Sequence, residues 1–117
     1  MKAVTKARAT LSLDVYLTDA EGREVFSANI THNMGVMAKE AGIYMHLWRP
    51  DELGITRAGD LIEPVAAGLA LMASEPKRFK AFDPANKWGS WKVFVPWIAE
   101  YLEALRAWPE STVRTCR

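Results

Sequence analysis

The length, composition and charge of the chain confine it to one ordinary globular domain. With 117 residues, half of them hydrophobic and a quarter charged, the chain is long enough to bury a core and too apolar to be disordered. Its 15 basic and 14 acidic side chains give a net charge of +1, which excludes the strongly basic signature of a general nucleic-acid binder. We therefore expect a single domain over residues 1–117.

The first 30 residues predict a β-hairpin. Leu11, Leu13, Val15 and Leu17 alternate with more polar residues, and this period of two is typical of a strand with one buried face. The turn that follows contains Gly22, which accepts positive φ, and residues 25–30 predict the returning strand.

Beyond residue 30 the apolar spacing changes to that of a helix. Apolar residues at helical spacing over 34–41 predict a helix that begins near His32. Thr31 or Asn33 is the expected N-cap, and Gly42 is the expected stop.

The segment 44–53 has no clean period. Because Pro50 disfavours helix in the residue before it, we interpret this segment as a structured connection with at most a short helical turn. Trp48 is the residue expected to anchor it.

The second half of the chain predicts three more helices. The first begins near Thr56 or Asp60, and Asp60 has capping-box spacing with the acid three residues later. A short helix is expected over residues 77–82. The longest apolar stripe runs from Ser90, the expected N-cap, to residue 108, and Pro96 predicts either a kink or a later regular start.

Residues 111–116 contain enough Thr and Val for a final strand. The order of elements predicts an α+β fold, in which a small antiparallel sheet, made of the N-terminal hairpin and a C-terminal strand, packs against three or four helices. A terminal strand can expose a sheet edge, so a homodimer is one expectation for the assembly.

Two polar and aromatic segments, 29–33 and 88–91, break the periodic patterning where an extended segment or loop enters a helix. Backbone N–H groups at such a point can converge on an anion, although capping alone explains the same residue types. Trp and Arg outside the regular periods are favoured anchors at protein interfaces. The predicted binding residues are Asn29, Thr31, His32, Asn33, Trp48, Arg49, Lys87, Trp88 and Trp91.

Three functions follow from these residues. The first is a protein-binding surface centred on Trp48, Arg49 and Trp88. The second is a nucleotide or nucleic-acid site, because residues 75–92 carry five basic groups and interleaved aromatics. The third is a small hydrolase with His32 as general base, which needs a carboxylate or carbonyl to orient the ring.

Catalytic, metal and cofactor signatures are weak throughout the chain. His32 and His46 lie far apart in sequence, and neither is near Cys116, so we expect no metal site. The serines lack the nucleophile-elbow pattern. We assign no catalytic residue and no cofactor, and we favour a non-enzyme over an enzyme.

Cysteine usage and the N-terminus bear on where the protein works. Cys116 is the only cysteine, so no internal disulfide can form, which favours a reducing compartment. No apolar run of signal-peptide length follows the early basic residues, and no stretch approaches the roughly 20 apolar residues that cross a bilayer. We expect a cytoplasmic protein with no membrane partner.

Three segments, namely 29–35 (NITHNMG), 47–52 (LWRPDE) and 88–90 (WGS), resemble those of short proteins of phages and mobile elements. The resemblance covers residues 23–117, and it departs after Gly35, where Val36 and Met37 replace a lysine-rich helix. It implies a small phage-type accessory protein that acts inside a bacterial host cell. Binding of a host protein or complex is the leading hypothesis for its role. Inhibition of a bacterial defence system, as by anti-CRISPR proteins, is one form of that role.

Overall fold

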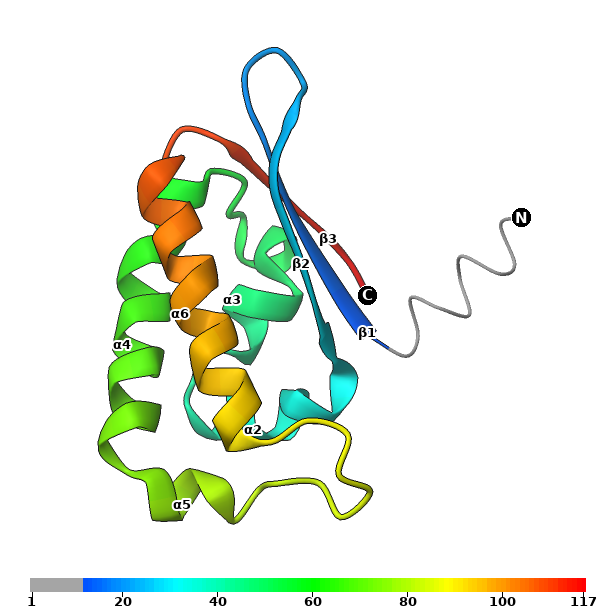
Figure 1. The fold of residues 1–117 in the computed structure, drawn as a ribbon. Helices are drawn as coiled ribbons and strands as arrows, with labels where there is room; N and C mark the ends of the chain where they lie inside the picture. Colours follow the sequence, from blue (N-terminus) through cyan, green and yellow to red (C-terminus); the bar gives the residue numbers. More distant parts are fainter. Residues whose placement is uncertain (1–11) are drawn as a thin grey trace, which may run out of the picture.

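A three-stranded antiparallel sheet forms one side of the molecule (Figure 1). The structure is a computed structural model that describes residues 12–117, so Leu11 and the basic residues before it lie outside the described part of the chain. The strands are β1 (Ser12–Thr18), β2 (Glu24–Thr31) and β3 (Thr112–Cys116). Strand β1 lies between β2 and β3, which confirms the predicted hairpin and the predicted C-terminal strand.

The alternation in β1 sets which side of the sheet is covered. Leu13, Val15 and Leu17 are fully buried, and the residues between them face the opposite side. In the β1–β2 turn, Gly22 has a φ of +84°, as the turn prediction requires.

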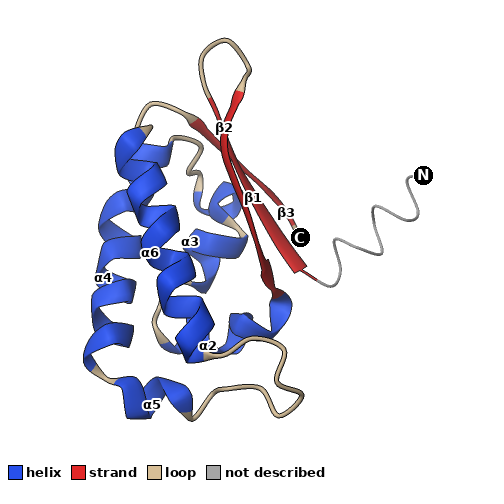
Figure 2. Ribbon diagram, viewed as in Figure 1, coloured by secondary structure: helices blue, strands red, loops and turns tan. Residues whose placement is uncertain are grey.

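Helices cover one face of this sheet, and α4 and α6 lie side by side (Figure 2). The longer helix, α6, also contacts β2. The α-helices are α2 (Gly35–Glu40), α3 (Tyr44–Trp48), α4 (Ile62–Ser74), α5 (Pro76–Lys80) and α6 (Trp91–Ala107), and short 3-10 segments span His32–Met34, Pro50–Leu53 and Ala58–Leu61.

Helix α6 provides much of the core, as its apolar stripe predicts. Phe94, Ile98 and Tyr101 are fully buried against the rest of the core. Ser90 caps the helix, because its Oγ accepts from the Val93 backbone N–H at 3.3 Å. Regular helix begins before Pro96, so the expected later start is wrong.

Two local predictions require correction. The segment 44–53 is helical over most of its length, since Pro50 stands at the first position of a 3-10 turn, where its missing N–H is harmless. The expected capping box at Asp60 does not form. Helix α4 follows a 3-10 turn and has Leu61 as an N-cap without a side-chain hydrogen bond, while Asp60 lies 3.6 Å from Arg57.

The two segments that break the sequence patterning are neighbours in the fold. Gly89 has a φ of +93°, and a Cβ built on it would lie 2.8 Å from both Thr31 Cγ2 and Met34 Cε. The loop before α6 therefore packs so closely on the start of the helical layer that only glycine fits. This contact joins residues 31–34 to residues 88–91.

Both β2 and β3 are edge strands, so the sheet has the edge that the homodimer prediction requires; assembly itself stays a prediction. Within the described part of the chain, no helix has the length and apolarity to cross a membrane.

We expect Gly89→Ala to lower the free energy of unfolding more than Gly22→Ala. Both positions have positive φ, which costs a residue with a Cβ about 1 kcal/mol. Only at Gly89 does the new methyl group also meet packed atoms, which adds roughly 1–3 kcal/mol. Urea denaturation of the two variants measures the difference, and equal losses would contradict the close packing.

Candidate functional site

Asn33 holds the two polar segments together. Its Nδ2 donates to Asn86 Oδ1 and to the Trp88 carbonyl oxygen, both at 3.2 Å. The Thr31 hydroxyl accepts from the Asn33 backbone N–H at 3.3 Å, so it caps the first 3-10 turn. The side chains of Asn33 and Thr31 therefore make hydrogen bonds within the protein. They position the loop that carries Trp88.

Asn29 lies apart from the other predicted site residues. On β2 it pairs with Asp14, on the side of the sheet away from the helices. Its Nδ2 donates to Ser12 Oγ at 2.9 Å and to Asp14 Oδ1 at 2.6 Å. Asn29 therefore links two strands and does not join a site with His32.

In the basic and aromatic segment 75–92, only one of the tryptophan side chains is mostly exposed to solvent. Trp91 is half-buried, with its Nε1 donating to the Met72 carbonyl oxygen at 3.0 Å and Lys80 Nζ 4.9 Å from its ring centroid. Trp88 is 66% exposed, and its neighbour Lys87 is exposed with a φ of +65°. Trp88 is thus the aromatic that this loop offers to solvent.

Trp48 is buried, with 2% of its surface exposed, so the expectation that it is displayed for docking is corrected. Its ring stacks on Tyr44 at 5.2 Å between centroids and meets Phe94 edge-on at 6.5 Å. Its Nε1 donates to His32 Nδ1 at 2.8 Å. A buried indole N–H needs an acceptor, and His32 supplies it.

The hydrogen bond from Trp48 assigns the state of the His32 ring. Since Nδ1 accepts, the neutral ring carries its proton on Nε2. A general base of the triad type needs the reverse arrangement, with Nδ1–H donated to an orienting group and Nε2 unprotonated. At Nδ1 the structure places a donor, Trp48, and the hydrolase hypothesis stays a prediction.

A polar pocket of about 360 Å³ lies beside this hydrogen bond. Among the described residues that line it, none is Asp or Glu, whereas several carry positive charge. The side chains that give it this character are His32, Lys39, Tyr44, Arg49 and Arg117.

Two acidic residues pair with the two guanidinium groups of the pocket. Arg49 Nη1 lies 2.6 Å from Glu52 Oε2, and Arg117 lies 3.1 Å from Asp51 and 3.3 Å from Glu52. Hydrogen bonds to Tyr44 and then to Glu52 raise the pKa of Arg49. The hydrogen bond from Arg117 lowers the pKa of Asp51. Both arginines are therefore charged and oriented before any ligand arrives.

Strand β3 brings Arg117 to this pocket from the far end of the chain. The Thr115 hydroxyl donates to the Trp48 carbonyl oxygen at 3.3 Å, which docks the strand on the end of α3. Sequence reasoning found His32 and Arg49 but missed Lys39, Tyr44 and Arg117. No local pattern marks these three, because tertiary packing alone gathers them.

An apolar hollow of about 490 Å³ adjoins the polar pocket. Lys39 and Tyr44 line both, and Met45, His46 and Leu53 belong to the hollow alone. His46 Nδ1 is buried without a hydrogen-bond partner among the described residues. Burial lowers the pKa of His46 from its ordinary value.

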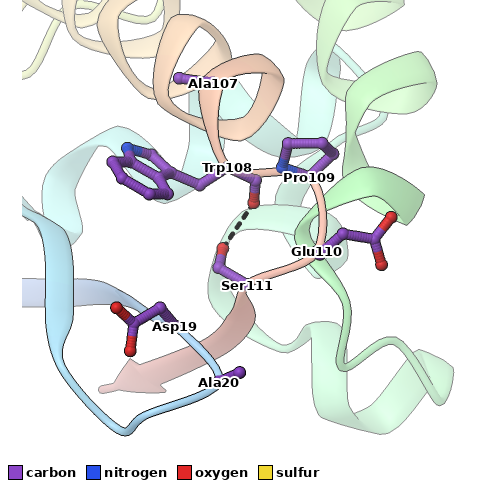
Figure 3. Close-up of a pocket in the computed structure, with 7 residues that line it drawn as sticks. All are labelled: Asp19, Ala20, Ala107, Trp108, Pro109, Glu110 and Ser111. Atoms are coloured by element: carbon purple, nitrogen blue, oxygen red, sulfur yellow. Dashed lines mark hydrogen bonds between the residues drawn. The ribbon is translucent and has the colours of Figure 1, made fainter.

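A third hollow, of about 250 Å³, lies between the β1–β2 turn and the end of α6 (Figure 3). Trp108 and Asp19 contribute to its wall, and the Ser111 hydroxyl donates to the Trp108 carbonyl oxygen at 2.7 Å. Its lining is mainly apolar and includes two acidic residues, so it lacks the convergent polar donors of the pocket beside His32.

Over residues 12–117, no group of three or more His, Cys, Asp or Glu side chains is placed to hold a metal ion. Comparison of the chain with protein-family models, with curated proteins and with solved structures found no match. The site is therefore interpreted from its own geometry.

We expect long-range ¹H–¹⁵N NMR spectra in alkaline solution to show His32 with its proton on Nε2, because Trp48 donates to Nδ1. The only other histidine, His46, is identified by the loss of its signals in His46→Gln. A proton on Nδ1 of His32 would contradict the hydrogen bond.

We also expect His46 to make stability fall in mild acid. Its pKa in the folded state lies below the ordinary value of 6.5, so the unfolded chain takes up the proton first as the pH falls. The free energy of unfolding is then full above about pH 6.5 and decreases below it. Urea denaturation across this range should show a shallower decrease for His46→Gln than for the natural chain; equal slopes would contradict the prediction.

Proposed function

We propose that the protein is a non-enzymatic, phage-type accessory protein that binds a host macromolecule. An anionic group of that macromolecule is held in the polar pocket. The observation that supports the proposal is the convergence of Lys39, Arg49 and Arg117 on one lining without a carboxylate. Inhibition of a bacterial defence complex is one form that such binding takes.

The cationic groups suit recognition because most of their orientation is fixed in advance. Arg49 and Arg117 are held from behind by Glu52 and Asp51, so little side-chain freedom is lost when an anion binds. Guanidinium groups match the planar geometry of a carboxylate or the edge of a phosphate. Lys39 adds a mobile third donor over the Tyr44 ring, with its Nζ 4.7 Å from the centroid.

The tautomer of His32 fits binding better than base catalysis. An imidazole with its proton on Nε2 is a hydrogen-bond donor at that nitrogen, and Trp48 maintains this state. The ring in this state is not arranged as a base of the triad type.

A second candidate function, binding of nucleotide or nucleic acid, is favoured by Trp88. Its ring is 66% exposed beside Lys87, as base stacking requires. Part of the nearby positive charge is already paired, since Arg78 lies 2.8 Å from Glu40 and 3.2 Å from Glu75. This pairing reduces the charge left for phosphates.

Titration of the ¹⁵N-labelled protein with acetate and with inorganic phosphate tests the first candidate. We expect the Trp48 indole N–H signal to shift at millimolar anion, because Trp48 lines the pocket, while the Trp88 signal stays in place. Lys39→Glu should weaken binding about tenfold or more, since it removes a charge-assisted donor.

Lys92→Glu is the matched control, because Lys92 is an exposed lysine on α6 outside the pocket. It should leave anion binding unchanged. An absence of any shift at the pocket would contradict the proposal. A single-stranded oligothymidylate that shifts the Trp88 signal, with steep salt dependence and loss in Lys92→Glu, would support the second candidate instead.

A further inference from the structure

The linings of the cationic pocket and the apolar hollow have two residues in common. Lys39 and Tyr44 line both, and the Tyr44 ring stacks on buried Trp48 with 5.2 Å between the ring centroids. Lys39 Nζ lies 4.7 Å from the same ring. A ligand that fills both hollows must therefore carry an anionic group and an apolar group on either side of one rigid aromatic wall.

The charge around the pocket suits a single negative charge. Lys39, Arg49 and Arg117 supply three positive charges, and the two carboxylates that hold the arginines, Asp51 and Glu52, supply two negative charges. These five side chains together carry one positive charge. A monoanionic carboxylate balances that charge.

The rims of the two hollows are apolar and open to solvent. Val36, in the wall of the pocket, is 57% exposed, and Leu53, in the wall of the hollow, is 44% exposed. Large apolar side chains grouped about a concave site are typical of a protein-binding surface. A peptide that lies across the site would cover both Val36 and Leu53.

We propose that the occupant is an acidic peptide segment of a protein partner, with one carboxylate in the cationic pocket and a neighbouring apolar side chain in the hollow. The inference rests on the proposed function, and it names the class of ligand. Lys39 and Arg49 receive the carboxylate, and Met45 and Leu53 receive the apolar side chain. The Tyr44 ring separates the two subsites and sets their spacing.

Fluorescence polarisation with synthetic peptides tests the proposal. The probes are labelled glycine–serine peptides that contain one glutamate and one leucine, separated by increasing numbers of glycines. We expect one narrow range of spacing to bind best, because the Tyr44 wall fixes the distance between subsites. Replacing the glutamate by glutamine or the leucine by serine should each weaken that peptide about tenfold.

Variants of the protein assign each half of the peptide to its subsite. Lys39→Met should weaken the glutamate peptide and leave the glutamine peptide unchanged. Leu53→Ser should weaken the leucine peptide and leave the serine peptide unchanged. Matched controls are Lys92→Met and Val93→Ser, which replace exposed residues of α6 outside both hollows and should bind like the natural protein.

The possible outcomes separate this inference from the proposed function. If acetate and phosphate shift the Trp48 signal but no spacing binds better than its glutamine and serine counterparts, the peptide inference is overturned and the anion site stands. If neither the anions nor the peptides bind, both fail. Binding that requires the glutamate but ignores the leucine and Leu53→Ser would also overturn the inference, because the hollow would then have no role.

Discussion

The buried hydrogen bond from Trp48 to His32 is the constraint on which the candidate site depends. An indole N–H taken out of water must be paired, and at 2.8 Å the His32 Nδ1 pairs it. The same indole packs on Tyr44 from α3 and on Phe94 from α6. One side chain thus joins the end of β2 to two helices. Its position in turn sets that of the Tyr44 ring, which lines the polar pocket.

The polar pocket follows from this constraint and from the place where β3 ends. Trp48 orients Tyr44, and its carbonyl oxygen accepts from Thr115, which brings Arg117 into the same pocket lining as Arg49. Acidic residues of the adjoining 3-10 turn then hold both guanidinium groups. Exposed ion pairs of this kind add little stability. Their effect here is on the orientation of the two guanidinium groups.

Local patterning predicted most of the elements and only part of the site. Apolar alternation marked the hairpin, and apolar spacing together with Ser90 marked α6, because these signals come from residues that are near each other in sequence. Trp48 and Arg49 were singled out because they break the pattern. Trp48 is buried and is therefore not an exposed anchor, whereas the role of Arg49 in binding stays a prediction. At the end of α3 the indole turns inward and the guanidinium turns outward, since Arg49 leaves helical geometry with a φ of −137°.

The amino-acid sequence by itself determined the α+β class, the hairpin, the final strand and the principal helix, because period and capping act over a few residues. It also marked the segments that contain His32 and Trp88 as unusual. Only the tertiary structure decided that these segments touch through Gly89 and that Lys39 and Arg117 line the same pocket. Contacts between residues far apart in the chain depend on how all the elements pack together, and no short stretch of sequence records that packing.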